Sequence, residues 1–144
     1  MRQIHVMDTS APSGTLNVLG ETISICGAGD DTKPFEIHVQ EGNLGGGPPP
    51  NHHPWDEAFY VLEGEVRLTV DGQEQIAQQG MLVNIPADTV HAYENLVGGT
   101  TLIGIVCDAK GGELFTSIDR EVKSLPEYLP KVIEVGQRYS VEFV

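Results

Sequence analysis

The stretch that decides the fold is GPPPNHHPWDEAFYVLEG, residues 47–64. It opens with a glycine and three prolines, which are typical of a rigid loop that leads into a strand. No Lys-Ser or Lys-Thr pair follows the glycines of residues 45–47, and prolines lack the backbone donors that a phosphate needs. The stretch therefore predicts a loop and a strand that carry two adjacent histidines and a carboxylate, rather than a phosphate-binding loop.

The order of the polar side chains decides which of them share a face. Side chains alternate along a strand, so His53 and Glu57 point to the same face, whereas His52 and His53 cannot both point inward from a regular strand. Glu57 also shares its face with Phe59 and Val61. A carboxylate on an apolar face is costly unless it is paired or bound to a metal. The pattern thus indicates a cationic partner for Glu57 inside the fold.

Short apolar patterns separated by turn residues surround this stretch on both sides. Asp71-Gly72 is a strong hairpin turn, and Gly64 separates two further strands. Strands this short and evenly spaced favour a β-sandwich or a closed barrel. The predicted strands are Glu21–Cys26, Phe35–Val39, Glu57–Leu62, Glu65–Val70, Gln73–Ala77, Met81–Ile85, Val90–Glu94 and Thr101–Cys107.

His38 lies within one of these patterns. The apolar face of its strand consists of Phe35, Ile37 and Val39, and His38 lies between the last two of these residues. Because His38 belongs to the opposite face, we expect it at the surface or in an interface between subunits, with a place in the pocket lining as the alternative.

The C-terminal segment has a different pattern from the strands before it. Residues 124–127, Ser-Leu-Pro-Glu, match a capping box, and Val132 and Ile133 begin an apolar stripe. Pro130 is tolerated in the first turn of a helix but not in its interior. We therefore expect one short helix over about residues 127–138, packed on the barrel.

Length, charge and cysteine content restrict the class of protein. The 144 residues fit one domain, residues 1–144, which can bury a core without disulfides. A net charge of −13 gives no attraction to phosphate backbones or anionic lipids, so neither nucleic acid nor a membrane is an expected partner. We find no apolar stretch of membrane-spanning length and no signal-peptide core. The two cysteines are not closely paired, and we expect a cytoplasmic protein with reduced thiols.

Three side chains are candidate metal ligands. They are His53, Glu57 and His91, the last on a later strand that can run antiparallel beside the first. Imidazole nitrogens together with a carboxylate oxygen suit divalent iron, manganese, nickel, cobalt or zinc. Buried structural histidines with satisfied hydrogen bonds are the alternative. Two histidines and a glutamate together favour one mononuclear metal ion.

The spacing of these residues resembles the two sequence motifs of the cupin family. The first motif, at residues 47–64, is filled by Gly47, His53, Glu57 and Gly64, and the second, at residues 80–95, by Gly80, Pro86, His91 and Asn95, with Asp88 in place of a glycine. Residues 54–64 and the tail at residues 137–143 are similar to small single-domain cupins of the cupin 2 conserved barrel family, often described as quercetin dioxygenase-like. The resemblance implies an all-β double-stranded β-helix, the cupin jelly-roll barrel, with a short C-terminal helix. It also implies one divalent transition metal ion and a homodimer.

One residue departs from the family motif. Family members usually carry histidine at the first position of His-x-His, where this sequence has Asn51. In one interpretation Asn51 contributes only a weak carbonyl contact, and the ligands are His53, Glu57 and His91, with open positions on the metal. In another, a bulge in the proline-rich entry turns His52 inward and restores three histidines. A site that binds no metal is the third interpretation.

The residues around the ligands indicate a substrate class. Phe59, Val61 and Tyr93 have the parity of the ligands and would line a mostly apolar cavity, which suits a small enol or aromatic molecule. Trp55 either gates the mouth of this cavity or has a packing role, in the core or at a dimer interface. Resemblance to quercetinase-like cupins implies a metal-dependent dioxygenase-like enzyme, an oxidoreductase, with Glu57 as the catalytic base. The alternatives are a non-catalytic module that binds a small ligand and a metal-dependent isomerase or hydrolase.

Overall fold

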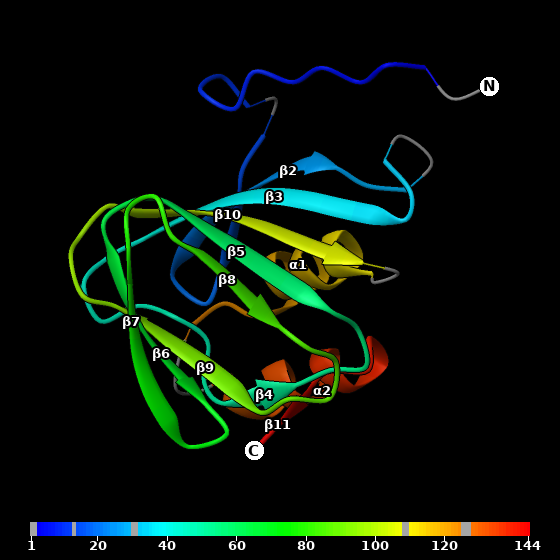
Figure 1. The fold of residues 1–144 in the computed structure, drawn as a ribbon. Coiled ribbons are helices and arrows are strands. Elements are labelled where there is room, and N and C mark those ends of the chain that lie inside the picture. The colour runs from blue at the N-terminus through cyan, green and yellow to red at the C-terminus, as the bar shows by residue number, and fades with distance from the viewer. Residues whose placement is uncertain (1–2, 13, 30–31, 108–109, 125–127) are drawn as a thin grey trace.

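Two antiparallel sheets form a jelly-roll β-barrel (Figure 1). The computed structural model describes residues 3–12, 14–29, 32–107, 110–124 and 128–144. One sheet has the order β1 (Leu16–Val18), β2 (Glu21–Gly27), β3 (Phe35–Gly42), β10 (Thr100–Cys107), β5 (Glu57–Glu63) and β8 (Leu82–Ile85). The other has the order β11 (Glu142–Phe143), β4 (Asn51–His52), β9 (His91–Asn95), β6 (Glu65–Val70) and β7 (Gln73–Gln78). The predicted fold class is confirmed, and each predicted strand is present with its ends shifted by a few residues.

The main core lies between the two sheets and follows the predicted alternation on β5. Glu57, Phe59 and Val61 are all buried on the inner face of that strand. Val61 packs with Leu68 of β6 and Leu102 of β10 in one apolar cluster. Each fully buried aliphatic side chain of this kind stabilises the fold by about 1.5–3 kcal/mol. The core therefore holds the strand that starts at Glu57 in a single register.

The prediction for His38 is wrong, because β3 turns its polar face inward. His38 is only 2% exposed, whereas Ile37 and Val39 on the outer face are half-buried. Inside the barrel, His38 Nε2 is 3.0 Å from Gln40 Oε1. Gly104 lies directly opposite on β10 and has no side chain, which leaves room for the imidazole ring. A polar partner and a glycine across the sheet thus make the buried position possible.

Two helices, rather than one, follow the last long strand. The predicted helix is present as α2 (Leu129–Arg138), with Pro130 in its first turn, as expected. Residues 125–127 of the predicted capping box lie outside the described residues. The unpredicted helix α1 (Gly111–Glu121) begins with two glycines and has no side-chain cap, so it lacks the sequence signals of a helix start.

Both helices lie at the same end of the barrel (Figure 1). They form a second core, in which Leu114 and Ile118 of α1 meet Val135 of α2 and Val18 of β1. None of the described residues forms a helix long and apolar enough to cross a membrane. Residues of this second core, among them Leu114 and Ile118, also line the cavity of the candidate site.

Two motif positions have backbone conformations that explain their residue types. Gly47 has a φ of 141°, and a Cβ there would lie 2.0 Å from the carbonyl oxygen of Tyr93, so only glycine fits. Asp88, which stands where the family motif has glycine, has a φ of 61°. Aspartate is among the few residues that enter this left-handed region. The departure at Asp88 therefore leaves the local turn intact.

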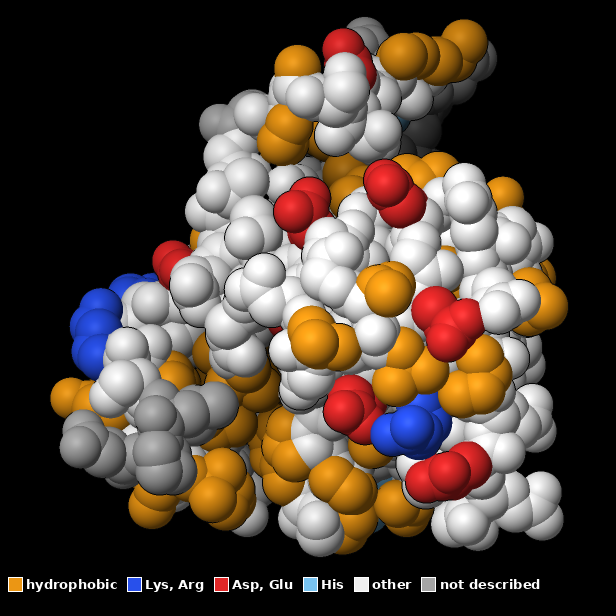
Figure 2. Space-filling view, turned by 90° about the vertical axis from the view of Figure 1, so that its left-hand side faces the viewer, with side chains coloured by type: hydrophobic (Ala, Val, Ile, Leu, Met, Phe, Trp, Pro, Cys, Tyr) orange, Lys and Arg blue, Asp and Glu red, His pale blue; other side chains and the backbone are white. Residues whose placement is uncertain are grey.

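The surface carries scattered acidic side chains and few basic ones, as Figure 2 shows for one face. This distribution agrees with the net charge of −13. On the outer face of β5, Tyr60 is 37% and Leu62 is 42% exposed. The homodimer implied by the family resemblance stays a prediction.

Candidate metal centre

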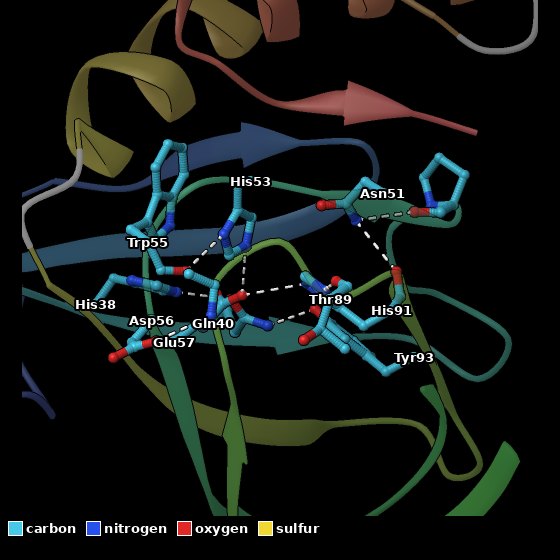
Figure 3. Close-up of polar contacts among 12 residues, drawn as sticks. His38, Gln40, Asn51, His53, Trp55, Asp56, Glu57, Thr89, His91 and Tyr93 are labelled. Atoms are coloured by element: carbon cyan, nitrogen blue, oxygen red, sulfur yellow. Dashed lines mark hydrogen bonds and ion pairs between the residues drawn. The ribbon is translucent and has the colours of Figure 1, made fainter. Parts of the chain in front are cut away.

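Three side chains from separate segments meet inside the barrel (Figure 3). His53 follows β4, Glu57 is the first residue of β5, and His91 is the first residue of β9. Glu57 Oε2 lies 3.0 Å from His53 Nε2 and 3.3 Å from His91 Nε2. All three side chains are buried, and their potential ligand atoms lie within 4.8 Å of one another. The structure thus brings together the three residues that the sequence singled out.

Backbone carbonyls fix the orientation of both imidazole rings. His53 Nδ1 lies 3.0 Å from the carbonyl oxygen of Trp55, and His91 Nδ1 lies 2.8 Å from that of Thr89. Because a carbonyl oxygen only accepts hydrogen bonds, each Nδ1 is the donor. The lone pair of each neutral imidazole is then on Nε2, the atom that faces Glu57. Such an outer hydrogen bond is the usual way in which proteins orient a metal-binding histidine.

The donor set fits a cation. With each Nδ1 bonded to a carbonyl, each Nε2 that faces Glu57 either donates a proton to the carboxylate or presents a lone pair to a metal ion. Three electron-rich atoms at these distances repel one another unless protons or a metal ion lie between them. Two imidazole nitrogens and one carboxylate oxygen are also the donor types that divalent transition metals prefer. These three residues can therefore hold a metal ion.

The charges of the cluster depend on one another. Burial alone would raise the pKa of Glu57, but the hydrogen bonds and the charge interactions with His53 and His91 together outweigh it and lower this pKa to about 2. Burial lowers the pKa of His91, but the hydrogen bonds with Glu57 and the Thr89 carbonyl and the charge of Glu57 together outweigh it, so the pKa of His91 is raised. Glu57 is therefore ionised at neutral pH and available as a ligand.

Asn51, rather than His52, points toward the cluster. Asn51 is buried and lines the same cavity as the three candidate ligands. Its amide nitrogen donates to the carbonyl oxygens of Pro49, at 3.0 Å, and His91, at 3.5 Å. His52 Nε2 instead lies 3.5 Å from Glu142 Oε2 on β11. The alternative in which a bulge turns His52 inward does not match the structure, because β4 pairs regularly with β11.

The cavity beside the cluster has a volume of about 100 Å³. Phe59 and Tyr93 line it, as the sequence predicted, with their rings edge to face at 5.6 Å. Val61, the third expected lining residue, lies in the core between the sheets and is 0% exposed. Trp55 also lines the cavity, and its ring stacks on His53 at 4.4 Å. Trp55 thus packs against a candidate ligand, and it holds that ligand with its backbone carbonyl as well.

Sequence reasoning missed a second polar group in the cavity wall. Tyr93 donates its hydroxyl to Glu21 Oε2 at 2.5 Å, and Asn95 Nδ2 donates to Glu21 Oε1 at 2.8 Å. Gln40 donates its side-chain amide to the Tyr93 hydroxyl oxygen. Burial raises the pKa of Glu21, and the hydrogen bonds from Tyr93 and Asn95 oppose that rise. The sequence did contain one signal for this group. His38 and Gln40 alternate with apolar residues on the same strand, so they share one face, and that polar face is the buried one.

Comparison with known proteins agrees with the fold. Residues 36–103 match the cupin domain family. Over 73 residues the chain is 33% identical to quercetin 2,3-dioxygenase of Bacillus subtilis, a match that covers 50% of this chain and 22% of that relative's length. The chain therefore corresponds to about a fifth of that relative.

Solved structures of low sequence identity share the fold. An RmlC-like cupin from Shewanella frigidimarina has a TM-score of 0.67 at 18% identity, covering 78% of this chain and 97% of its own. A sugar phosphate isomerase of the cupin superfamily from Silicibacter pomeroyi has a TM-score of 0.55 at 22% identity, covering 61% of this chain and 59% of its own. The domain match at residues 36–103 and the jelly-roll barrel agree: this part of the chain is similar to the cupin domain family, and the fold is the one that these cupin structures share.

Proposed function

We propose that this protein is a metal-dependent, dioxygenase-like enzyme that acts on a small enol or aromatic substrate. The observation that carries the proposal is the convergence of His53, Glu57 and His91 on one point of a mostly apolar cavity. The similarity to quercetin 2,3-dioxygenase over half of the chain supports the reaction class. The metal is one divalent ion of iron, manganese, nickel, cobalt or zinc.

His53, Glu57 and His91 would hold this ion, and Asn51 is the fourth residue at the site. The amide nitrogen of Asn51 is committed to two backbone carbonyls, which leaves its oxygen as the atom that can approach a metal. An amide oxygen is a weaker ligand than an imidazole nitrogen for these metals. We therefore expect three strong ligands from the protein and open positions for substrate.

A bound divalent metal would polarise an enol oxygen and bring the substrate together with dioxygen. Glu57 would accept the enol proton at its carboxylate once the substrate loosens its contacts with His53 and His91, which otherwise lower its pKa to about 2 and make it a weak base. The carbonyls of Trp55 and Thr89 keep both imidazole rings in place during this transfer. Phe59 and Tyr93 exclude water from one wall of the cavity, which strengthens the electrostatic interactions inside it.

The test combines metal analysis with oxygen uptake. Protein reconstituted separately with each of the five metals is analysed for metal content and then assayed with a panel of β-diketones, flavonols and catechols. We expect one metal per chain and oxygen uptake with at least one metal and substrate, both lost in His91→Ala. His52→Ala is the matched control, because His52 lies next to Glu142 and away from the cluster. Metal-loaded protein that consumes no oxygen with any compound would refute the oxygenase.

A second candidate function is a non-catalytic module that binds a small ligand in the barrel. Asn51 favours it, because this residue replaces a strong histidine ligand of the family motif and so weakens the affinity for metal. Purified protein that retains no metal after reconstitution but binds a small molecule in the cavity would favour this module over the enzyme.

A further inference from the structure

The cavity beside the candidate metal centre is also lined by a group of apolar side chains from β1, α1 and the C-terminal segment. We call this part of the cavity the apolar chamber, and its walls are Val18, Leu114, Phe115, Ile118, Val141 and Phe143. Four of these side chains are buried, namely Val18, Leu114, Ile118 and Val141. The chamber and the three candidate ligands border the same cavity, so a molecule held at one can reach into the other.

Charge restricts what can enter this cavity. Among the described residues that line it there is no lysine or arginine, whereas Glu21 and Glu57 both border it. The Glu21 carboxyl already accepts hydrogen bonds from Tyr93 and Asn95, and no basic side chain accompanies it. A carboxylate or phosphate beyond the metal centre would lose its hydration without gaining a counter-ion. The lining therefore selects against anionic substituents, including the phosphate of a sugar phosphate.

Size gives a second restriction. The volume of about 100 Å³ belongs to the whole cavity, including the space beside the candidate ligands, so little of it remains for an apolar substituent. A short alkyl group therefore fits in the chamber, whereas a longer one meets Leu114 and Ile118 of α1. Close packing makes such a limit sharp, because each further methylene must displace a buried side chain.

We propose that the substrate is uncharged and carries a short apolar substituent, which the apolar chamber binds while the metal centre holds the enol oxygens. Only one part of this inference rests on the proposed function, namely that the substrate carries an enol group. The chamber walls come from β1, α1 and the C-terminal segment, which lie outside the cupin domain match at residues 36–103. Leu114 and Ile118 of α1 are then the specificity-determining residues, and they set the permitted length of the substituent.

The test is a homologous series of probes. Zinc-loaded protein, which is redox-inert, is titrated by protein-detected NMR with pentane-2,4-dione, hexane-2,4-dione, heptane-2,4-dione, octane-2,4-dione and longer members. Burial of each methylene is expected to tighten binding about fourfold, until the chain length at which the chamber is full. Beyond that length we expect the affinity to stop rising or to fall.

Variants of α1 test which residues set the longest chain that the chamber accepts. Leu114→Ala removes about three carbon atoms from the chamber wall, so the limiting probe should lengthen by up to about three carbons. Ile118→Val removes one methylene, disturbs the fold less and should lengthen the limit by about one carbon. Leu82→Ala is the matched control, because Leu82 is 67% exposed and lies on β8 outside this cavity. An unchanged limit in both α1 variants, with both folded, would overturn the assignment.

The charge restriction has its own matched pair of probes. In 4,6-dioxoheptanoate a carboxylate replaces the terminal methyl group of heptane-2,4-dione, and we expect it to bind at least tenfold more weakly. Equal or tighter binding of the carboxylate would refute the uncharged substrate, and so would a diketone series with no dependence on chain length.

A metal-independent arm separates this inference from the proposed function. Metal-free protein is titrated with pentan-2-one through octan-2-one, which reach the chamber but lack the chelating enol. If these ketones show the same dependence on chain length while zinc does not tighten diketone binding, the chamber is upheld and the metal centre fails. If the ketones show no such dependence, the chamber itself is refuted, whatever the metal does.

Discussion

Gly104→Ala should destabilise the protein through a single contact inside the barrel. Gly104 lies on β10, directly opposite His38 on β3. A Cβ at this position would lie 2.2 Å from His38 Nε2 and 2.3 Å from its Cε1. The imidazole ring has little room to retreat, because it is 2% exposed and meets the ring of Phe115 at 4.9 Å. The added methyl group must therefore displace His38 or part the two strands.

The expected cost follows from two effects. Overpacking a core by one methyl group costs about 1–3 kcal/mol. Displacing His38 also breaks its 3.0 Å hydrogen bond with Gln40 and leaves buried polar atoms unpaired, at about 1–3 kcal/mol. We expect a loss of about 3 kcal/mol in the free energy of unfolding. In a chain of this size that loss lowers the melting temperature by roughly 6–12 °C.

The assay is urea denaturation of the metal-free protein, followed by circular dichroism. Gly98→Ala is the matched control, since a Cβ there has a single neighbour, the backbone nitrogen of Leu44 at 4.0 Å. Gly98 is exposed, so the control should change stability by less than about 1 kcal/mol. If Gly104→Ala is as stable as Gly98→Ala, the inward position of His38 and the reasoning from it are refuted.

Three further predictions concern the metal centre, the Glu21 carboxyl and the turn at Asp88. A metal that binds the cluster should stabilise the wild-type protein by about 2.7 kcal/mol at one hundred times its dissociation constant. A thermal-shift titration should show no such gain in His91→Ala and a full gain in His52→Ala; an equal gain in all three proteins would place the metal elsewhere. Burial raises the pKa of Glu21, so the folded protein binds this proton more tightly than the unfolded chain does, and stability is lost as the pH rises from 4.5 through the raised pKa. Urea titrations at pH 4.5 and 7.5 should therefore show Glu21→Gln gaining stability relative to wild type at the higher pH, and a constant difference would contradict this. Asp88→Gly should raise the free energy of unfolding by about 0.5–1 kcal/mol, because glycine adopts the φ of 61° without steric cost; a destabilised variant in the same urea assay would contradict that reason.

Local patterns were sufficient for most of the strands and for the candidate ligands. Alternation placed Glu57 on the inner face of β5 together with Phe59, and motif spacing paired His53 with His91. Both inferences depend on side-chain parity and on short sequence distances, which the chain itself specifies. Pro130 located the start of α2 for the same reason, since its effect on a helix is local.

The errors came from positions whose environment is supplied by distant segments. His38 was assigned to the surface because its neighbours Ile37 and Val39 are apolar, yet the inner face of β3 is the polar one. Its burial depends on Gln40 beside it and on Gly104, which lies on another strand. Helix α1 was missed because it lacks a cap, and its apolar residues are stabilised by contacts with β1 and α2.

By itself, the sequence determined the barrel, the two motif segments and the three residues of the candidate metal centre. The strand periodicity favoured a sandwich or barrel, the resemblance to the cupin motifs implied the jelly-roll barrel, and spacing with ligand chemistry indicated the three residues. Only the tertiary structure decided that Asn51 rather than His52 borders the cluster, because that choice depends on how β4 pairs with β9 and β11. The apolar chamber could not be predicted from the sequence either, because α1 and the C-terminal segment meet β1 only when the chain is folded. A cavity is formed by residues that are distant in sequence, and so its shape and charge belong to the packed structure.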